Sequence, residues 1–265
     1  MRREKFSRNP DQLIKKAWTK NCAGDTLPEI IMSLLLTIRE RFIVPAVLLA
    51  SPFLVFGEAT VNPSGTEYSA AGALPGDQLH SSVSLDQNGG YIVWDDNASD
   101  KSGSGISCVR LNSSYNKISA FTVNKFTKGD QRKPQVQLLK NGGAIVVWQG
   151  VGLKGHDIFA RILKPDGTFQ TSDVRVNTYI KDEQTEPVVT ALPDGGAMIA
   201  WKSIGQDGSM AGIYARKISA EGTLAQPEVL INLATAFNQR SPSLTTLANG
   251  NVAITWISEQ ERFQS

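Results

Sequence analysis

The 265-residue chain has only two cysteines and two histidines, and each scarcity excludes a class of protein. Cys22 lies in an N-terminal segment expected to be removed, which leaves Cys108 alone in the rest of the chain. Neither an intramolecular disulfide nor a zinc site made of cysteines is then expected, and we expect Cys108 to be a buried apolar residue. His80 and His156 stand in no recognisable catalytic or metal-binding motif. No glycine-rich phosphate loop precedes a helix, so no nucleotide site is predicted.

An excess of charge is also missing. Residues 60–265 carry eighteen lysines and arginines against nineteen aspartates and glutamates, and the two signs are interspersed. Such a surface offers no electrostatic footprint for nucleic acid or for an anionic membrane. The expected partner is therefore a protein or a glycan, and not nucleic acid.

Long hydrophobic runs are absent as well. The apolar, uncharged run 43–56 has fourteen residues and two prolines, which is short for a membrane span of about 20 residues. Two arginines precede it and Gly-Glu-Ala follows, as in a secretory signal peptide that starts at Met32 and is cleaved after Ala59; an uncleaved anchor is the alternative. The predicted parts are an N-terminal extension with signal peptide, residues 1–59, and a repeat domain, residues 60–265. The expected location is the envelope or the outside of a bacterial cell, with only transient membrane contact.

What the chain does have is a period of about 53 residues. Tryptophans recur at this period, glutamines precede them by 16 or 17 residues, and an Asn-Gly or Asp-Gly turn lies between the two. The tryptophans are Trp94, Trp148, Trp201 and Trp256, and the glutamines are Gln78, Gln131, Gln184 and Gln239. A fixed period of this length is typical of propellers and repeat arrays, in which each unit buries its faces against its neighbours.

Each unit contains four short β-type runs joined as an antiparallel meander. The second run, which ends at the tryptophan, is almost continuously apolar and is expected to be buried on both faces. The Asn-Gly and Asp-Gly turns predict hairpins in which both central residues tolerate positive φ. The fold class predicted is all-β, a β-propeller-like array of four-stranded antiparallel blades, with about three and a half blades present. A β-sandwich is the competing fold, and the strict period argues against it.

The motifs Val-Asn, Gln-x-x-Pro, Asp/Asn-Gly-Gly-x-x-x-x-Trp and Ile-Tyr/Phe-Ala-Arg resemble the tandem repeats of large secreted or surface-bound bacterial proteins. The resemblance covers residues 60–256 and implies a β-propeller-like array. Some of those proteins resemble calcium-binding adhesins in composition, but the glycine-aspartate nonapeptides that bind calcium in such adhesins are absent here.

Other residues recur with the repeat and are interpreted as parts of the scaffold, because a residue needed in every blade is usually needed for packing. The glutamines are expected to bind the backbone of a neighbouring loop, and the tryptophans to fill the space between blades. The further recurring residues are Asn124, Asn177 and Asn232 at strand ends, and Arg110, Arg161 and Arg216 in the third run.

One loop offers a weak calcium candidate, formed by the oxygen-bearing side chains of Asp95, Asp96, Asn97 and Asp100. Their spacing matches no standard calcium loop, so a solvated loop is the competing interpretation. No other cofactor and no catalytic residue is predicted.

These observations favour an exported, non-enzymatic scaffold for binding or adhesion, whose ligand would contact the loops after the tryptophans. Two alternatives stay open: a propeller hydrolase that acts on glycans, and a truncated remnant of a larger adhesin. The repeat domain ends nine residues after Trp256, and Val61-Asn62 resembles the end of a fourth strand that could complete the last blade.

Overall fold

The computed structural model describes residues 18–20, 67 and 69–259, and every regular element within them is a β-strand. The strands are β1 Trp18–Lys20, β2 Gln78–Asp86, β3 Gly89–Asp96, β4 Gly105–Leu111, β5 Lys117–Thr122, β6 Gln131–Leu138, β7 Ala144–Val151, β8 His156–Leu163, β9 Val174–Arg175, β10 Gln184–Ala191, β11 Ala197–Ile204, β12 Ala211–Ile218, β13 Val229–Leu230, β14 Gln239–Thr246 and β15 Val252–Ser258.

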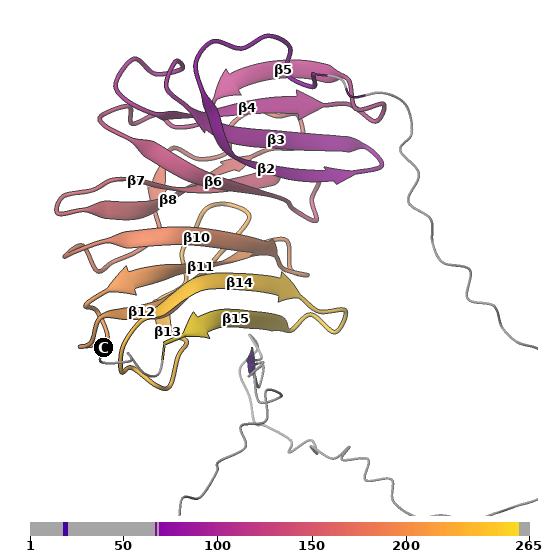
Figure 1. Ribbon diagram of the computed structural model, residues 1–265. Helices are drawn as coiled ribbons and strands as arrows, with labels where there is room; N and C mark the ends of the chain where they lie inside the picture. Colours follow the sequence, from indigo (N-terminus) through magenta and orange to yellow (C-terminus); the bar gives the residue numbers. More distant parts are fainter. Residues whose placement is uncertain (1–17, 21–66, 68, 260–265) are drawn as a thin grey trace, which may run out of the picture. The chain divides into compact units, whose positions relative to one another are not determined.

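The strands form antiparallel sheets in chain order, which we call blades 1 to 4. Blade 1 is β2-β3-β4-β5, blade 2 is β6-β7-β8-β9 and blade 3 is β10-β11-β12-β13. Blade 4 contains β14 and β15, with the short β1 on the outer side of β15. The blades follow one another in sequence order (Figure 1). The predicted all-β array of four-stranded, propeller-like blades is confirmed.

The first two strands of a blade are joined by a turn that differs in one respect from the prediction. Only the glycine of each turn, such as Gly142 at φ 82° and Gly195 at φ 92°, has a positive φ. Asn141 keeps an ordinary backbone conformation, and its side-chain oxygen accepts a hydrogen bond from the amide of Gly143 at 2.9 Å. Asn and Asp are suited to this position because their side chains can close a turn on the backbone two residues later.

Each first strand contains a β-bulge at the same place. The register against the second strand shifts between Leu79 and Ser82 in blade 1, and at the matching positions of the other three blades. One residue of each bulge has a left-handed backbone, and these residues are His80 (φ 48°), Lys133 (φ 52°), Glu186 (φ 58°) and Ser241 (φ 53°). A non-glycine residue in this region costs about 1–3 kcal/mol, so the surroundings must hold it there. A bulge also turns a side chain away from the regular pleat.

The hydrophobic core consists of layers between consecutive blades. One layer joins blades 1 and 2 around Val93, Cys108 and Trp148, and the next joins blades 2 and 3 around Ile158 and Trp201. Burial of Cys108 among apolar side chains raises the pKa of its thiol. The second strands of blades 1 to 3 are mostly buried, as their apolar runs predict, whereas Thr255 and Ile257 of β15 are exposed.

The predicted signal peptide, its start at Met32, its cleavage after Ala59 and the strand end at Val61-Asn62 lie outside the described residues. Within the described part of the chain, no helix could span a membrane. The strand at the outer side of β15 is β1, which pairs residue by residue with Val252–Ile254.

Candidate functional site

The repeated glutamines and tryptophans bind each other within their own blade. In blades 2, 3 and 4 the glutamine Oε1 accepts the indole N–H of the tryptophan at 3.1 to 3.2 Å. In blades 2 and 4 the glutamine also donates from Nε2 to a backbone carbonyl of the loop before its strand, that of Lys128 or that of Ala236. Blade 1 departs from the pattern, since Gln78 is exposed and Trp94 donates to Asp96 at 3.1 Å.

The three asparagines close the fourth strand onto the third. Asn177 accepts a hydrogen bond from the amide of Ile158 at 2.7 Å and donates to Asp157 and to the carbonyl of Tyr179. Asn124 and Asn232 make the equivalent bonds in blades 1 and 3. These side chains are almost fully buried, and each one both donates and accepts hydrogen bonds, so they belong to the scaffold.

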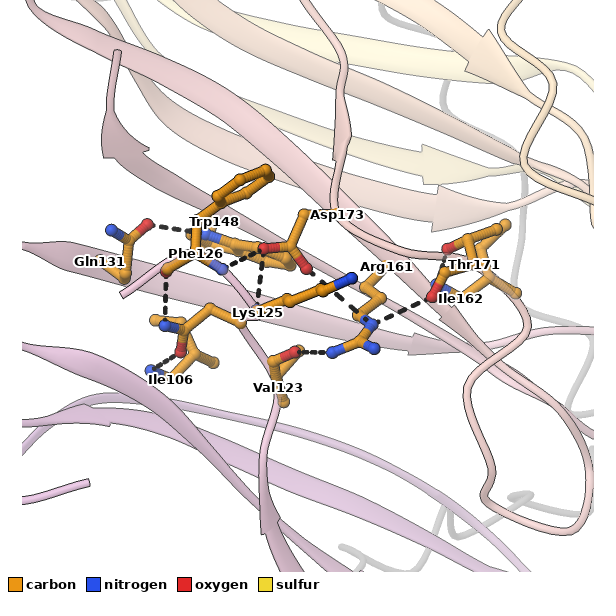
Figure 2. Close-up of polar contacts among 11 residues, drawn as sticks. Ile106, Val123, Lys125, Phe126, Gln131, Trp148, Arg161, Ile162, Thr171 and Asp173 are labelled. Carbon is orange, nitrogen blue, oxygen red and sulfur yellow. Dashed lines mark hydrogen bonds and ion pairs between the residues drawn. The ribbon is translucent and has the colours of Figure 1, made fainter. Parts of the chain in front are cut away.

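The arginines join consecutive blades. Arg161 of blade 2 donates from Nη1 to the carbonyl of Val123 in blade 1 at 2.5 Å, and from Nε to Thr171 in its own blade (Figure 2). Arg216 binds Val176 in the same way across the next boundary. Arg110 points forward instead and donates to Pro165 and Asp166 of blade 2. All three are thereby engaged in contacts between blades.

The four calcium candidates do not converge on one point. Asp96 binds Trp94 and the amide of Ala98, whereas Asn97 binds Asp77. Asp100 accepts hydrogen bonds from the side chain of Asn124 and the amide of Ser102. Asp95 lies elsewhere, against the bulge of blade 1. In the described ranges, no group of three or more His, Cys, Asp or Glu side chains is placed to hold a metal ion.

Chemically active side chains do gather at the bulges of the first strands. We call this group the first-strand cluster, and its members are His80, Asp95, Lys133, Gln149, Glu186, Lys202 and Ser241. The first strands of consecutive blades contact one another, which brings the four bulges next to each other in order. Asp95, Gln149 and Lys202 each directly follow the tryptophan of their blade.

Hydrogen bonds across the blade boundaries hold the strained bulges. The amide of Lys133 in blade 2 donates to Oδ1 of Asp95 in blade 1 at 3.1 Å. The amide of Glu186 in blade 3 donates to Gln149 of blade 2 at 3.2 Å. The bulges of blades 2 and 3 are thus each fixed by a side chain of the preceding blade, which offsets the cost of the left-handed residue.

His80 and Asp95 form an acid–base pair in this cluster. Nδ1 of His80 lies 2.9 Å from Oδ1 of Asp95. The Asp95 side chain is 1% exposed and that of His80 is 44% exposed, so the buried carboxylate orients a ring that reaches solvent. The second ring nitrogen, Nε2, makes no hydrogen bond within the described residues. Oδ2 of Asp95 is buried and has no hydrogen-bond partner there either.

Glu186 and Lys202 form a second pair of different character. Nζ of Lys202 donates to Oε1 of Glu186 at 2.7 Å, and the Glu186 side chain is 25% exposed. Burial raises the pKa of Glu186, but the hydrogen bonds from Lys202 and Ser241 and the charges of Lys202 and Lys133 outweigh it. The pKa therefore lies below its usual value, and Glu186 is a carboxylate at neutral pH.

Sequence reasoning did not find this cluster, and it named no catalytic residue. A usable indication was present in the repeat itself: the residue two positions after the repeat glutamine is different in every blade. His80, Lys133, Glu186 and Ser241 occupy this position. A fixed backbone that carries a variable side chain is where a repeat protein places its chemistry.

Two other features lie outside the cluster. His156 binds Glu183 at 2.6 Å, so the described structure holds a second histidine–carboxylate pair, at the start of β8. A cavity of about 670 Å³ lies along blade 2, and Val151, Leu153 and Asp157 contribute to its lining. Leu153 lies in one of the loops after the tryptophans that were expected to contact a ligand, and Val151 and Asp157 lie on the strands that flank this loop.

Comparison with known proteins adds the following. No protein-family model matches the chain, and a search of curated proteins found no match. Among solved structures, the endo-arabinase of Bacteroides thetaiotaomicron matches with a TM-score of 0.46 and 12% identity, over 68% of this chain and 69% of that one. A family 117 glycoside hydrolase of the marine bacterium Zobellia galactanivorans has a TM-score of 0.41 and 13% identity, over 71% of this chain and 64% of that one. The catalytic domain of a Coprinopsis cinerea GH62 alpha-L-arabinofuranosidase has a TM-score of 0.39 and 10% identity, over 67% and 62%.

These matches correct two expectations. The chain was expected to be a non-enzymatic scaffold for binding or adhesion, but the three solved structures named above are glycoside hydrolases. The expectation that the protein is not an enzyme, which rested on the lack of a catalytic motif, is contradicted in the same way. At identities of 10 to 13% the likeness concerns the fold alone, so an activity has to be argued from the residues of this chain.

Proposed function

We propose that the chain is a hydrolase that acts on glycans and that the first-strand cluster is its catalytic site. The observation that carries the proposal is the presence, in one cluster, of two acid–base groups with different surroundings. His80 is held by a buried aspartate and reaches solvent, whereas Glu186 is kept ionised by Lys202. Cleavage of a glycosidic bond requires a proton donor for the leaving oxygen and a carboxylate on the other side of the sugar.

The two groups have separate roles in this proposal. Glu186 is the carboxylate that activates water or stabilises the positive charge that develops on the sugar ring. His80 is the proton donor and acts from Nε2 on the leaving oxygen. Asp95 is a positioning residue, since it fixes the ring through Nδ1. Lys133 and Lys202 keep Glu186 ionised.

A glycan outside the cell is the substrate class that agrees with the N-terminal sequence. The apolar run 43–56, with arginines before it and small residues after it, supports export through a signal peptide and division of the chain near Ala59. We propose on this basis that the repeat domain works in the envelope or beyond it. N-terminal sequencing of the protein recovered from the medium or the periplasm of an expressing bacterium tests this; an intact N-terminus would contradict it.

The catalytic proposal is tested with a panel of chromogenic glycosides and with reducing-end release from plant and algal polysaccharides. On a substrate that is cleaved, Glu186→Gln and His80→Asn should each lower kcat by about 10²-fold or more. Gln can still accept the amide of Ser241, so Glu186→Gln is expected to fold. Glu183→Gln and His156→Asn, which alter the other histidine–carboxylate pair, serve as matched controls and should keep full activity. Undiminished cleavage by Glu186→Gln would refute the assignment.

A further inference from the structure

The cavity of about 670 Å³ on blade 2 has the features of a second binding site. Its lining includes Gln131 at the start of β6, Val151 at the end of β7 and Arg175 at the end of β9, so it lies at one end of the sheet. It shares no lining residue with the first-strand cluster. Its volume falls within the range of about 300–1,000 Å³ that is usual for small-molecule sites.

Hydrogen bonds of the backbone hold the walls of this cavity together. Oδ2 of Asp173, just before β9, accepts the amides of Lys125 and Phe126 at 2.8 and 2.9 Å (Figure 2). These bonds fix the loop between blades 1 and 2 against β9. The side chains of Phe126 and Lys128, from this loop, therefore line the same cavity as Arg175.

The two acids in the lining are already engaged with the scaffold. The side chains of Asp157 and Asp173 are 4% and 1% exposed. Asp157 accepts a hydrogen bond from the side chain of Asn177 at 2.7 Å. Oδ1 of Asp173 makes no hydrogen bond in the described structure, but it lies 3.9 Å from Nε of Arg161. Neither carboxylate therefore presents its charge to solvent.

Two cations of the lining, in contrast, are exposed and free to bind. The Arg175 side chain is 43% exposed, and its one charged neighbour among the described residues is Asp157, at 3.8 Å from Nη1. Lys128 is also exposed. Neither its ammonium nor the guanidinium of Arg175 makes a hydrogen bond within the described part of the chain. The solvent-facing charge of the cavity is therefore positive.

Arg216 adds a buried positive charge to the cavity wall. It is 3% exposed, its Nη2 has no hydrogen-bond partner, and no carboxylate of the described ranges forms an ion pair with it. Arg161, its equivalent in blade 2, lies 3.9 Å from Asp173 and 3.4 Å from the ring centroid of Phe169. Leu224 takes the position of Phe169 in blade 3 and lines the cavity. A buried cation is costly unless an opposite charge is supplied, and at this boundary the described chain supplies none.

We propose that this cavity binds a segment of a glycan that carries negatively charged groups, at a place separate from the catalytic site. A carboxylate or sulfate of the sugar contacts Arg175 and Lys128, and its charge offsets that of Arg216. Phe126 and Leu153, which are 61% and 76% exposed, provide apolar surface for the face of a sugar ring. The choice of a sugar rests on the proposed function, whereas the negative charge of the ligand follows from the cavity itself.

The test measures binding by isothermal titration calorimetry to the full chain with Glu186→Gln, so that no substrate is consumed. The charged probes are a trisaccharide of galacturonic acid and a sulfated galactan trisaccharide. Their uncharged counterparts are the same sugars after reduction of the carboxyl groups and after removal of the sulfates. At least one charged probe should bind with 1:1 stoichiometry, and its uncharged counterpart should bind about tenfold more weakly or less. The two charged probes distinguish a carboxylate from a sulfate as the recognised group.

Two further substitutions locate the bound probe, each with a matched control. Arg175→Gln should weaken binding of the charged probe about tenfold, whereas Arg132→Gln should not, because Arg132 is similarly exposed but pairs with Asp130. Leu153→Asp places a negative charge in the lining and should weaken binding about threefold. Leu233→Asp should leave binding unchanged, since Leu233 is also 76% exposed but does not line this cavity. Circular dichroism confirms that each variant retains its fold.

Three results would overturn the proposal. The first is no binding of either charged probe, and the second is equal binding of the charged and uncharged forms. The third is binding that Arg175→Gln and Leu153→Asp leave unchanged, because the probe would then lie elsewhere, as in the first-strand cluster. Binding that follows the expected pattern, together with a parent chain that cleaves no glycoside, would support the cavity site and count against the proposed activity alone.

Discussion

The backbone amide of Ser241 donates a hydrogen bond to Oε2 of Glu186 at 2.8 Å, so the central carboxylate of blade 3 fixes the bulge of blade 4. The other oxygen of the same carboxylate binds Lys202. Oε2 of Glu186 thus fixes the backbone of blade 4, and the bond from Lys202 to Oε1 favours the ionised form of the side chain. Changes at Glu186 and at its partners should therefore separate into effects on stability and effects on chemistry.

The pH dependence of activity should follow Lys202. Lys202→Met removes the ammonium that lowers the pKa of Glu186 and leaves burial, which raises it. The acid limb of the pH profile of kcat/KM should therefore move to higher pH. Lys217→Met is the control, because Lys217 pairs with Asp194 in an exposed turn. An unmoved acid limb in Lys202→Met would show that Glu186 does not set it.

The stability of the fold should depend on the ionisation of Glu186 and fall in acid. Its pKa is lower in the folded chain than in the unfolded chain, so its ionisation stabilises the fold above the unfolded pKa of about 4.3. This contribution is lost as the pH falls through the lowered folded value. The gap in Tm between the parent chain and Glu186→Gln should therefore be constant near neutral pH and close in acid, as followed by circular dichroism. A gap that widens in acid would contradict the sign.

Gln184→Ala should destabilise the chain because it leaves the buried indole N–H of Trp201 without an acceptor. The expected loss is about 1–3 kcal/mol in the free energy of unfolding, measured by urea titration. Gln78→Ala is the matched control, since Gln78 occupies the same repeat position but is exposed, and Trp94 binds Asp96 instead. Equal losses in the two variants would argue against the indole contact as the cause.

Arg161→Lys should weaken the boundary between blades 1 and 2. A single ammonium cannot reproduce the fork of donors that reaches both Val123 and Thr171. We expect a loss of about 1–3 kcal/mol in the free energy of unfolding. Arg132→Lys, at an exposed pair with Asp130, should change it by less than about 1 kcal/mol. If the two changes cost the same, the contact across the boundary contributes little.

Cys108 should be unreactive in the native chain, because it is fully buried and its pKa is raised. In a Cys22→Ser background, labelling with a thiol reagent should be slow in buffer and complete in urea. Rapid labelling in buffer would show that blade 1 opens readily.

The fold could be predicted from the sequence because the same structural residues recur in every repeat. The tryptophan strands, the turn glycines and the asparagines recur at one period, and the structure places each set in equivalent positions. The contacts between blades were beyond reach, since the period does not reveal that Arg161 binds backward to Val123 whereas Arg110 binds forward to Pro165.

The first-strand cluster was missed for a related reason. The residues that recur in every repeat are those of the scaffold, whereas the cluster consists of residues that differ from blade to blade. A β-bulge cannot be recognised from alternation of apolar residues alone, so nothing in the pattern showed that His80 turns toward Asp95.

The bulges also have a consequence for how such a chain can change. The left-handed backbone at Lys133, Glu186 and Ser241 is held by hydrogen bonds from the main-chain amides of these residues, which any residue other than proline provides. A different side chain at one of these positions is therefore held by the same backbone hydrogen bonds. The packing of the core layers does not change. When a blade is duplicated, one amino-acid substitution at this position can then give the new blade a different functional side chain. The array can therefore acquire new chemistry one blade at a time.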